Sequence, residues 1–481
     1  MRSQFSHHTV KLQLAAVLAA ALVLRVYRLL NISMWSDEYH TVRLVRLSLP
    51  ELAAGRYAGE LNPPLYYLLL HLTLDVAGES ELAMRLFSLT FAIGALLLYF
   101  FLIREMFPHR STQLAVAGTA LMALHPLFIY YATEIRAYSA LLFFTLLSLI
   151  SYYRVQRGSA RPVLWSLVLV LSLAACPYLH HFGVLSLLAV ATFAGTHLWL
   201  RRHPRRQLFA LSLVGLAALL YLPGAIHFLF RQANIYPAQS ALVEPAQFLQ
   251  LFTFSLHQPS YETGIFAIAA LTTAVGFALL VRDAEERAAG VAIGLVLLLA
   301  VAVTLLAYGR GINIVPRYLL HLAPLLFILT VAPIGIGGTH WTGRLVRGLG
   351  LVTLVLYGAY AMDFTQHTDE ETELVNWKSD WEQVATVIEH LGLTSQPLVL
   401  TAWDNSPLQY YVENPAIAFA DFEKARAQHP QQAFLLVLSE NSAPLTDRWH
   451  TVDLYSDPAE SLQLLYIPSA TGNPASEGAQ R

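Results

Sequence analysis

The sequence predicts an α-helical polytopic membrane protein with about eleven transmembrane helices and a small C-terminal α/β domain. Of its 481 residues, 56% are hydrophobic and only 13% are charged, and the mean hydropathy is +0.50. Soluble globular proteins carry roughly 25% charged residues. Many of the apolar residues also gather in stretches of about 20, the length that crosses a bilayer as a helix. The bilayer is therefore the natural solvent for this chain.

Eleven apolar stretches have the composition of membrane spans, and a further short one does not fit. The short stretch, Pro64–Ala77, begins at the second of two prolines, and its length is typical of an interfacial or re-entrant helix. The basic start of the chain resembles a signal peptide, but we interpret the first stretch as an uncleaved span. The eleven spans are expected at residues 12–30, 82–103, 112–129, 137–153, 162–176, 182–200, 207–229, 263–281, 288–307, 318–336 and 345–362.

The placement of arginine decides whether residues 64–77 cross the membrane. Short loops rich in Lys and Arg stay in the cytoplasm. If residues 64–77 do not cross, every basic cluster falls on the same side as the N-terminus. We therefore predict a cytoplasmic N-terminus, an outer C-terminus, and residues 64–77 as an outer-face juxtamembrane or re-entrant helix. The five clusters are Arg104 with Arg110; Arg154, Arg157 and Arg161; Arg201, Arg202, Arg205 and Arg206; Arg282 with Arg287; and Arg344 with Arg347.

This topology predicts three parts. Residues 1–362 form the membrane domain, whose outer-face loop 31–81 is its most informative polar segment. Residues 363–467 alternate between apolar strand and helix patterns, which predicts a small extracytoplasmic α/β domain. Residues 468–481 have the composition of a disordered tail. The only cysteine, Cys176, excludes an intramolecular disulfide, and a net charge of −2 gives no support to nucleic-acid binding.

The segment Trp35-Ser36-Asp37-Glu38 follows the first span and holds two adjacent carboxylates beside aromatic rings. A carboxylate in such a place suits a general base toward a hydroxyl or amide, or a ligand for a divalent cation. The alternative is a solvated helix start, where Asp37 and Glu38 only favour the helix dipole. Further along, Glu60 and Asn62 precede the two prolines and are candidates to line a site, whereas the prolines themselves start a helix.

Three later segments carry polar residues to the same predicted face. Arginine suits a phosphate, because its planar fork donates several hydrogen bonds, although an ion pair or snorkelling to headgroups would equally explain such residues. Histidine could bind phosphate or metal, or be a satisfied buried side chain. Together they suit chemistry on a lipid-borne phosphate. These candidates are Glu134, Arg136 and Tyr138; His180 and His181; and Arg317 with Tyr318.

In this order, the segments resemble bacterial membrane glycosyltransferases of the GT-C class. More closely, they resemble the group related to the protein O-mannosyltransferases and the lipid A aminoarabinose transferases, over about residues 10–415. Relatives commonly have a histidine where this chain has Asn62, which weighs against a titratable or metal-binding group there. The matching segments are Trp35–Glu38, Asn62–His71, Glu81–Ser88, Tyr131–Tyr138, Tyr178–His181, Pro316–Leu320 and Lys378–Trp381.

The resemblance implies transfer of a sugar from a polyprenyl-phosphate donor to an acceptor on the outer face of a bacterial inner membrane. Asp37 would then be the general base, with Glu38 beside it. Arg136, Arg317, His180 and His181 would hold the donor phosphate. The acceptor stays open among protein, lipid A, polysaccharide and glycolipid. No cofactor is required by the sequence, and a divalent metal cation is left as an alternative.

Two other classes of function remain. A transporter or flippase of lipid-linked sugars would have a similar hydropathy, but such folds often show inverted repeats and polar groups at the midplane. A membrane scaffold would use the outer domain to bind a partner, and it would leave Asp37 and Glu38 without a task.

Overall fold

The computed structural model divides into two compact units. The first comprises residues 1–29 and 45–366, and the second comprises residues 30–44 and 367–481. The structure describes residues 7–30, 32–55, 62–110, 112–200, 203–235, 262–309, 316–336, 341–366, 381–400, 407–439, 452–456 and 462–469.

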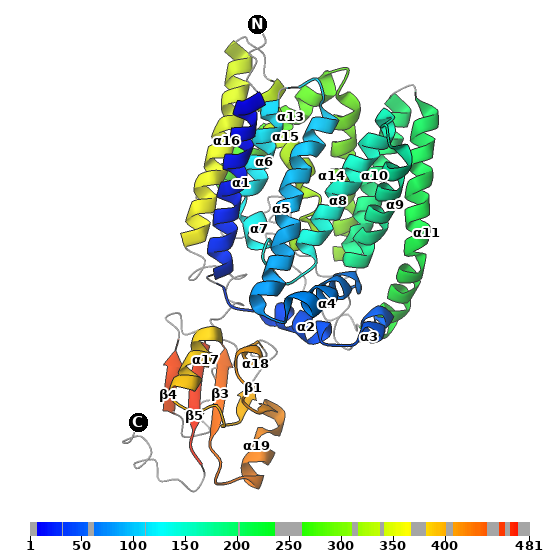
Figure 1. Ribbon diagram of the computed structural model, residues 1–481. Coiled ribbons are helices and arrows are strands. Elements are labelled where there is room, and N and C mark those ends of the chain that lie inside the picture. Colours follow the sequence, from blue (N-terminus) through cyan, green and yellow to red (C-terminus); the bar gives the residue numbers. More distant parts are fainter. Residues whose placement is uncertain are drawn as a thin grey trace. The chain divides into compact units, whose positions relative to one another are not determined.

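The first unit is a bundle of long helices with shorter ones at one end (Figure 1). Helix α8 packs on α5 and α9, α10 packs on α11 and α14, and α15 packs on α6, α13 and α16. The helices are α1 His7–Leu30, α3 Leu49–Ala54, α4 Leu65–Ala77, α5 Glu81–Met106, α6 Thr112–Leu124, α7 Pro126–Tyr130, α8 Tyr138–Arg157, α9 Pro162–Leu179, η1 His181–Gly183, α10 Val184–Leu200, α11 Pro204–Ile235, α13 Glu262–Arg282, α14 Arg287–Tyr308, η2 Pro316–Leu319, α15 Ala323–Ile336 and α16 Trp341–Gln366.

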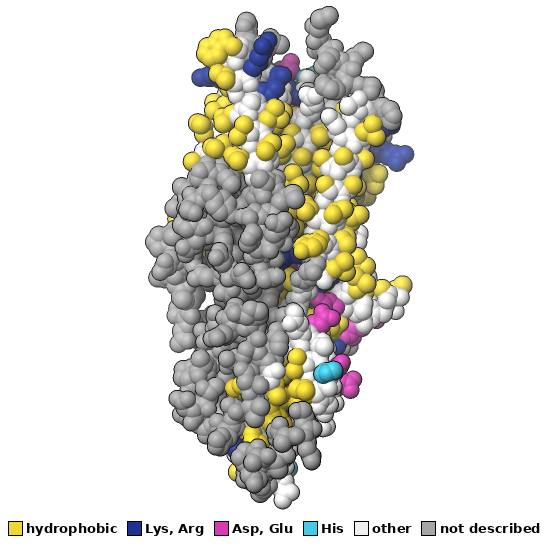
Figure 2. Space-filling view, turned by 90° about the vertical axis from the view of Figure 1, so that its left-hand side faces the viewer, with side chains coloured by type: hydrophobic (Ala, Val, Ile, Leu, Met, Phe, Trp, Pro, Cys, Tyr) yellow, Lys and Arg dark blue, Asp and Glu magenta, His cyan; other side chains and the backbone are white. Residues whose placement is uncertain are grey.

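A helix accompanies each of the eleven predicted spans. Among the described residues, seven helices are long and apolar enough to cross a membrane, and four shorter helices are also apolar. Large apolar side chains such as Val23, Leu219 and Val355 are about two-thirds exposed. Figure 2 shows such hydrophobic side chains over the surface of the helices. Because water would not tolerate this surface and lipid tails do, the fold is that of a multi-pass membrane protein.

Four of the five basic clusters meet at one end of the bundle. Glu105, at the end of α5, pairs with Arg154 and Arg157 at the end of α8. Arg206 donates to the backbone of Gln156, and Arg110 binds the turn between α13 and α14 through Asp283 and Glu286. This is the arrangement that the eleven-span topology requires. The side of the membrane that this end faces stays a prediction.

Helix α4 has the size expected of a juxtamembrane helix rather than a span. It covers 13 residues and lies against α3, α5 and α9, at the end of the bundle opposite the basic clusters (Figure 1). Pro64 is its N-cap, as the two prolines predict. The exposed ion pair between Arg46 and Glu79, at 2.5 Å, joins the chain on either side of α3 and α4.

Two predicted spans are interrupted by a break in the helix. The span expected at 112–129 stops at Leu124, and Pro126 starts the separate helix α7 with His125 as its N-cap. Proline disfavours the helical conformation of the residue before it, which explains this break. The span expected at 318–336 begins only at Ala323, after the short 3-10 helix η2. Conversely, α9 continues through Pro177, where a turn was expected.

The second unit contains a five-stranded mixed sheet in the order β2-β1-β3-β5-β4. β1 pairs in parallel with β2 and β3, and β5 pairs antiparallel with β3 and β4. Alternate strand residues form two cores, one against α17 and α18 and the other against α19. The elements are α2 Ser36–Val45, of which Val45 belongs to the first unit, α17 Trp381–His390, β1 Leu398–Leu400, α18 Leu408–Tyr411, β2 Ala416–Ala418, α19 Phe419–Gln428, β3 Phe434–Ser439, β4 Val452–Ser456 and β5 Leu462–Ile467.

The orientation of α4 can be tested with single cysteines in a Cys176→Ala background. Ala77 is exposed at the end of α4, and Ala160 is exposed after α8. A membrane-impermeant maleimide should label Ala77→Cys in intact cells, and Ala160→Cys only after permeabilisation. Labelling of both from the same side would show that the chain crosses the membrane once more or once less between them.

Gly276 lies at a close contact between α13 and α15, which predicts that an alanine there lowers stability. A Cβ atom at this position of α13 would lie 1.8 Å from the Leu329 carbonyl oxygen of α15. Gly276→Ala should therefore lower the unfolding midpoint in detergent, because overpacking costs about 1–3 kcal/mol. Gly215→Ala is the matched control, since a Cβ there meets nothing within 4 Å. Equal midpoints for the two variants would contradict the tight α13–α15 contact.

Candidate functional site

The acidic segment, Trp35–Glu38, belongs to the second unit, and its last three residues form the first turn of α2. The Trp35 carbonyl accepts the helical hydrogen bond of Tyr39 N–H at 2.9 Å, and Glu38 Oε2 accepts from the Trp35 N–H at 3.2 Å. Glu38 thus occupies the position that a capping-box glutamate takes, and it is fully buried. Asp37 is half-buried, and its carbonyl accepts from the Thr41 hydroxyl. Glu38 therefore has a structural task, and Asp37 is the more exposed of the two candidate carboxylates.

In the first unit, the turn between α7 and α8 is buried despite its polar sequence. Thr133 and Glu134 are each 1% exposed, and Arg136 is 7% exposed. Arg85 of α5 donates to the Thr133 carbonyl at 3.2 Å and pairs with Glu81 at 2.7 Å. Buried charges inside a membrane protein are costly and mark functional positions. Side chains of α5 and α8 thus bind the backbone of this turn at Thr133 and at Tyr131.

A cluster of aromatic and basic side chains lies beside this turn, and three separate segments supply it. The His180 ring centroid lies 4.9 Å from that of Tyr318 and 5.9 Å from that of Tyr138. Tyr131 packs edge-on against Tyr138 at 5.4 Å, and the Arg317 guanidinium lies 5.7 Å from the Tyr318 ring centroid. We call Tyr131, Tyr138, His180, Arg317 and Tyr318 the tyrosine–histidine cluster. It unites four predicted site residues with Tyr131, which begins one of the matching segments but was not predicted as a site residue.

Hydrogen bonds define the chemistry that this cluster offers. The Phe182 N–H donates to His180 Nδ1 at 3.2 Å. A neutral His180 ring must therefore carry its proton on Nε2, where it is a donor rather than a metal ligand. Burial raises the pKa of Tyr131, while the Arg317 guanidinium, which hydrogen-bonds the phenol, opposes part of the rise. Donors of this kind, close to a cation, suit an anionic oxygen such as that of a phosphate.

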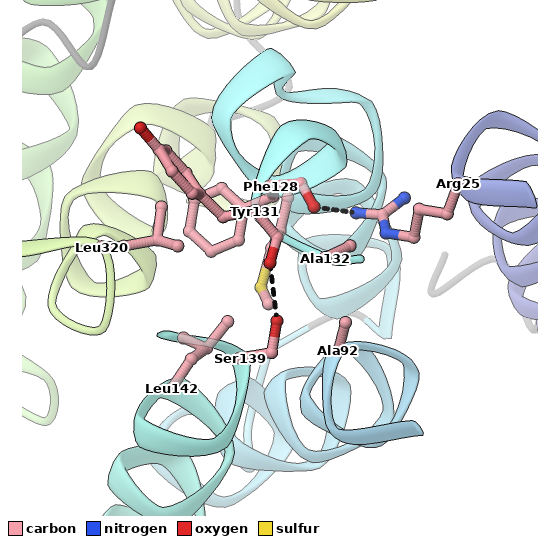
Figure 3. Close-up of a pocket in the computed structure, with 9 residues that line it drawn as sticks. Arg25, Ala92, Phe128, Tyr131, Ala132, Ser139, Leu142 and Leu320 are labelled. Carbon is pink, nitrogen blue, oxygen red and sulfur yellow. Dashed lines mark hydrogen bonds between the residues drawn. The ribbon is translucent and has the colours of Figure 1, made fainter. Parts of the chain in front are cut away.

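A small cavity of about 10 Å³ lies behind Tyr131 and is shown in Figure 3. Arg25 reaches it from α1 and donates to the Phe128 carbonyl at 3.1 Å and to the Ala123 carbonyl at 2.9 Å. Ser139 donates to the Tyr131 carbonyl at 3.0 Å. At this volume the cavity holds a water molecule at most. Its lining therefore supports the backbone beside the cluster.

The sequence analysis did not identify Arg25 and Arg85 as residues near the candidate site. A signal existed for both, because each is a charge within an apolar span. Of the predicted site residues, Asn62 and His181 are half-buried in the first unit, and Glu60 lies outside the described residues. In the part of the chain that the structure describes, no group of three or more His, Cys, Asp or Glu side chains is arranged to hold a metal ion.

Comparison with known proteins finds one matching family model and several solved structures with a similar fold. Residues 50–236 match the family model of dolichyl-phosphate-mannose-protein mannosyltransferase. This segment includes the proline pair, the turn between α7 and α8, and His180. No curated protein sequence matches the chain.

Three solved structures share the fold at low sequence identity. ArnT from Cupriavidus metallidurans, bound to undecaprenyl phosphate, has a TM-score of 0.56 at 14% identity, covering 95% of this chain and 99% of that one. The oligosaccharyltransferase AglB from Archaeoglobus fulgidus, bound to an inhibitory peptide and a dolichol-phosphate, has a TM-score of 0.55 at 11% identity, covering 98% and 76%. The arabinofuranosyltransferase AftD from Mycobacteria has a TM-score of 0.54 at 13% identity, covering 95% and 40%. The chain thus has the fold of the GT-C membrane glycosyltransferases, and its residues 50–236 match the mannosyltransferase family model.

Proposed function

We propose that this protein is a glycosyltransferase that moves a sugar from a polyprenyl-phosphate donor to an acceptor on the outer face of a bacterial inner membrane. The observation that carries this proposal is the tyrosine–histidine cluster. It gathers donors suited to a phosphate at breaks between membrane helices, in a fold whose solved examples include two with a polyprenyl phosphate bound. A lipid phosphate would reach such donors from the bilayer without leaving it.

In the proposed reaction Asp37 is the general base. It takes the proton of the acceptor hydroxyl or amide as the acceptor atom attacks the anomeric carbon of the sugar. The bond between that carbon and the phosphate oxygen breaks, with inversion, and the polyprenyl phosphate leaves with the bonding electrons. No nucleotide is needed, because the lipid phosphate ester is the activated bond.

Arg317 and Arg136 are the proposed cations that stabilise the leaving phosphate as its charge grows, with His180 and His181 as further ligands. Donors placed in advance where charge develops cost no reorganisation during the reaction. Tyr138 and Tyr318 would line the site through the ring contacts that fix His180. Glu60, Asn62 and Glu134 are also proposed as residues that line the site. The assay described next, with several donors and acceptors, identifies the sugar and the acceptor.

The role of Asp37 is tested by Asp37→Asn. With radiolabelled polyprenyl-phosphate mannose or aminoarabinose and a panel of acceptors, transfer should fall by about 10²- to 10⁴-fold, the usual contribution of a general base. Glu51→Gln is a matched control, because Glu51 is a carboxylate that only caps α3 through Ser48. Transfer by Asp37→Asn at the wild-type rate would rule out the base assignment. Lipid movement across the bilayer without bond cleavage would favour the flippase.

The role of Arg317 is tested by Arg317→Met. The variant should raise the donor KM and lower kcat by about 10²-fold, because a phosphate ligand acts in both the ground state and the transition state. Arg46→Met is the control: Arg46 is an exposed arginine of the same unit that pairs with Glu79. If Arg317→Met and Arg46→Met have the same donor KM and kcat, Arg317 does not bind the phosphate.

A further inference from the structure

Two hydrogen bonds join helix α18 of the second unit, which we call the sheet unit, to the residues on either side of the acidic segment Trp35–Glu38. The Met34 N–H donates to the Tyr411 hydroxyl at 2.9 Å. The Tyr39 hydroxyl donates to Gln409 Oε1 at 2.9 Å. These two hydrogen bonds bracket Asp37, one before it and one after it, and both come from a single turn of helix. The partners are more than 360 residues apart in the sequence, so the contact is entirely tertiary.

The helix that makes these contacts is fixed in the core of its unit. Leu408, at its start, is fully buried together with Trp381, Ile388 and Leu435, and Tyr411 packs against the same core. Val412 follows it in that core, and the Asn414 amide then donates to the carbonyls of Leu393 and Gln396 at 2.9 and 2.8 Å. A helix tied at both ends in this way is a rigid platform.

The acidic segment is rigid within itself as well. Glu38 closes the turn onto Trp35, and Thr41 holds the Asp37 carbonyl. Residues 30–44 also form one compact unit with residues 367–481. The backbone on both sides of Asp37 is therefore constrained by side chains other than that of Asp37, and these side chains need touch no substrate.

We propose that Gln409 and Tyr411 are positioning residues that orient Asp37 for proton abstraction. The sheet unit would then contribute to the chemical step, in addition to any contact that it makes with an acceptor. This inference rests on the proposed function, since it needs Asp37 to be the base. It predicts an effect on kcat, because misplacement of a catalytic group by about 1 Å costs up to about 10²-fold in rate.

The test compares side chains that differ only in the hydrogen bond. Tyr411→Phe removes the acceptor of the Met34 N–H, and Gln409→Met removes the acceptor of the Tyr39 hydroxyl with little change in shape. Each should lower kcat by about 10- to 100-fold and leave the donor KM unchanged. Gln409→Glu keeps an acceptor oxygen and should restore most of the rate. Thr386→Val, which removes a hydroxyl bonded only within α17, is the control.

A double-mutant cycle shows whether the effect passes through the contact itself. Tyr39→Phe with Gln409→Met should be no slower than either variant alone, because both remove the same hydrogen bond. Unfolding midpoints of all variants, measured on the full-length protein, report any loss of folding separately from kcat.

Two outcomes would overturn the inference. One is wild-type kcat in both Tyr411→Phe and Gln409→Met. The other is an equal loss in Gln409→Glu and Gln409→Met, which would exclude the hydrogen bond as the cause. Asp37→Asn in the same assay separates this inference from the proposed function. If Asp37→Asn is inactive and Tyr411→Phe is not impaired, only the inference fails, whereas an active Asp37→Asn removes its foundation.

Discussion

The structure of the first unit depends on one constraint, that backbone polar groups inside a bilayer must find partners within the chain. An unbroken helix satisfies its own backbone groups. The ends of α7, the turn after it and the start of α15 leave some backbone groups without helical partners. Arg25 supplies donors to the carbonyls of Ala123 and Phe128, and Arg85 supplies one to Thr133. Tyr99 of α5 likewise donates to the Pro324 carbonyl at 2.7 Å, in the first turn of α15. The breaks in the helices are thus stabilised by side chains from their neighbours.

The same constraint places the candidate site. A helix end leaves backbone groups and polar side chains at a depth where intact helices offer only apolar surface. The tyrosine–histidine cluster collects where three such ends meet, after α7, after α9 and before α15. A phosphate-binding group would be expensive elsewhere in the bundle, since a charge without partners is strongly disfavoured there. The breaks in the helices and the candidate phosphate site therefore lie together, because only helix ends offer polar partners there.

The fold could largely be predicted from sequence, because hydropathy and arginine placement are properties of single segments. Each expected span has a helix, and the break at Pro126 has a local signal in its proline. The contacts of Arg25 and of α18 have none, because a side chain that reaches over 98 or over 377 residues leaves no pattern near either partner. In the sheet unit, β2 has only three residues and α19 has a weak apolar face, so periodicity did not indicate them.

The assignment within the acidic segment shows the same limit. The family resemblance singled out Asp37 as the base, but the residue types alone could not separate it from Glu38, since adjacent carboxylates at a helix start look alike. Their difference is geometric: Glu38 reaches back to the Trp35 N–H and is buried, whereas Asp37 remains half-exposed. Local helix geometry therefore ranks the two residues where composition could not.

The buried arginine of α1 also bears on how the chain is assembled. Helix α1 is made before α6 and α7, and the carbonyls that Arg25 binds at Ala123 and Phe128 are synthesised about a hundred residues after it. An arginine near the end of a newly inserted helix can reach the lipid interface with its charged group until other partners form. Arg25 therefore gains these backbone carbonyls only once α6 and α7 have been inserted. The helix break around Pro126 thus also completes the hydrogen bonding of α1.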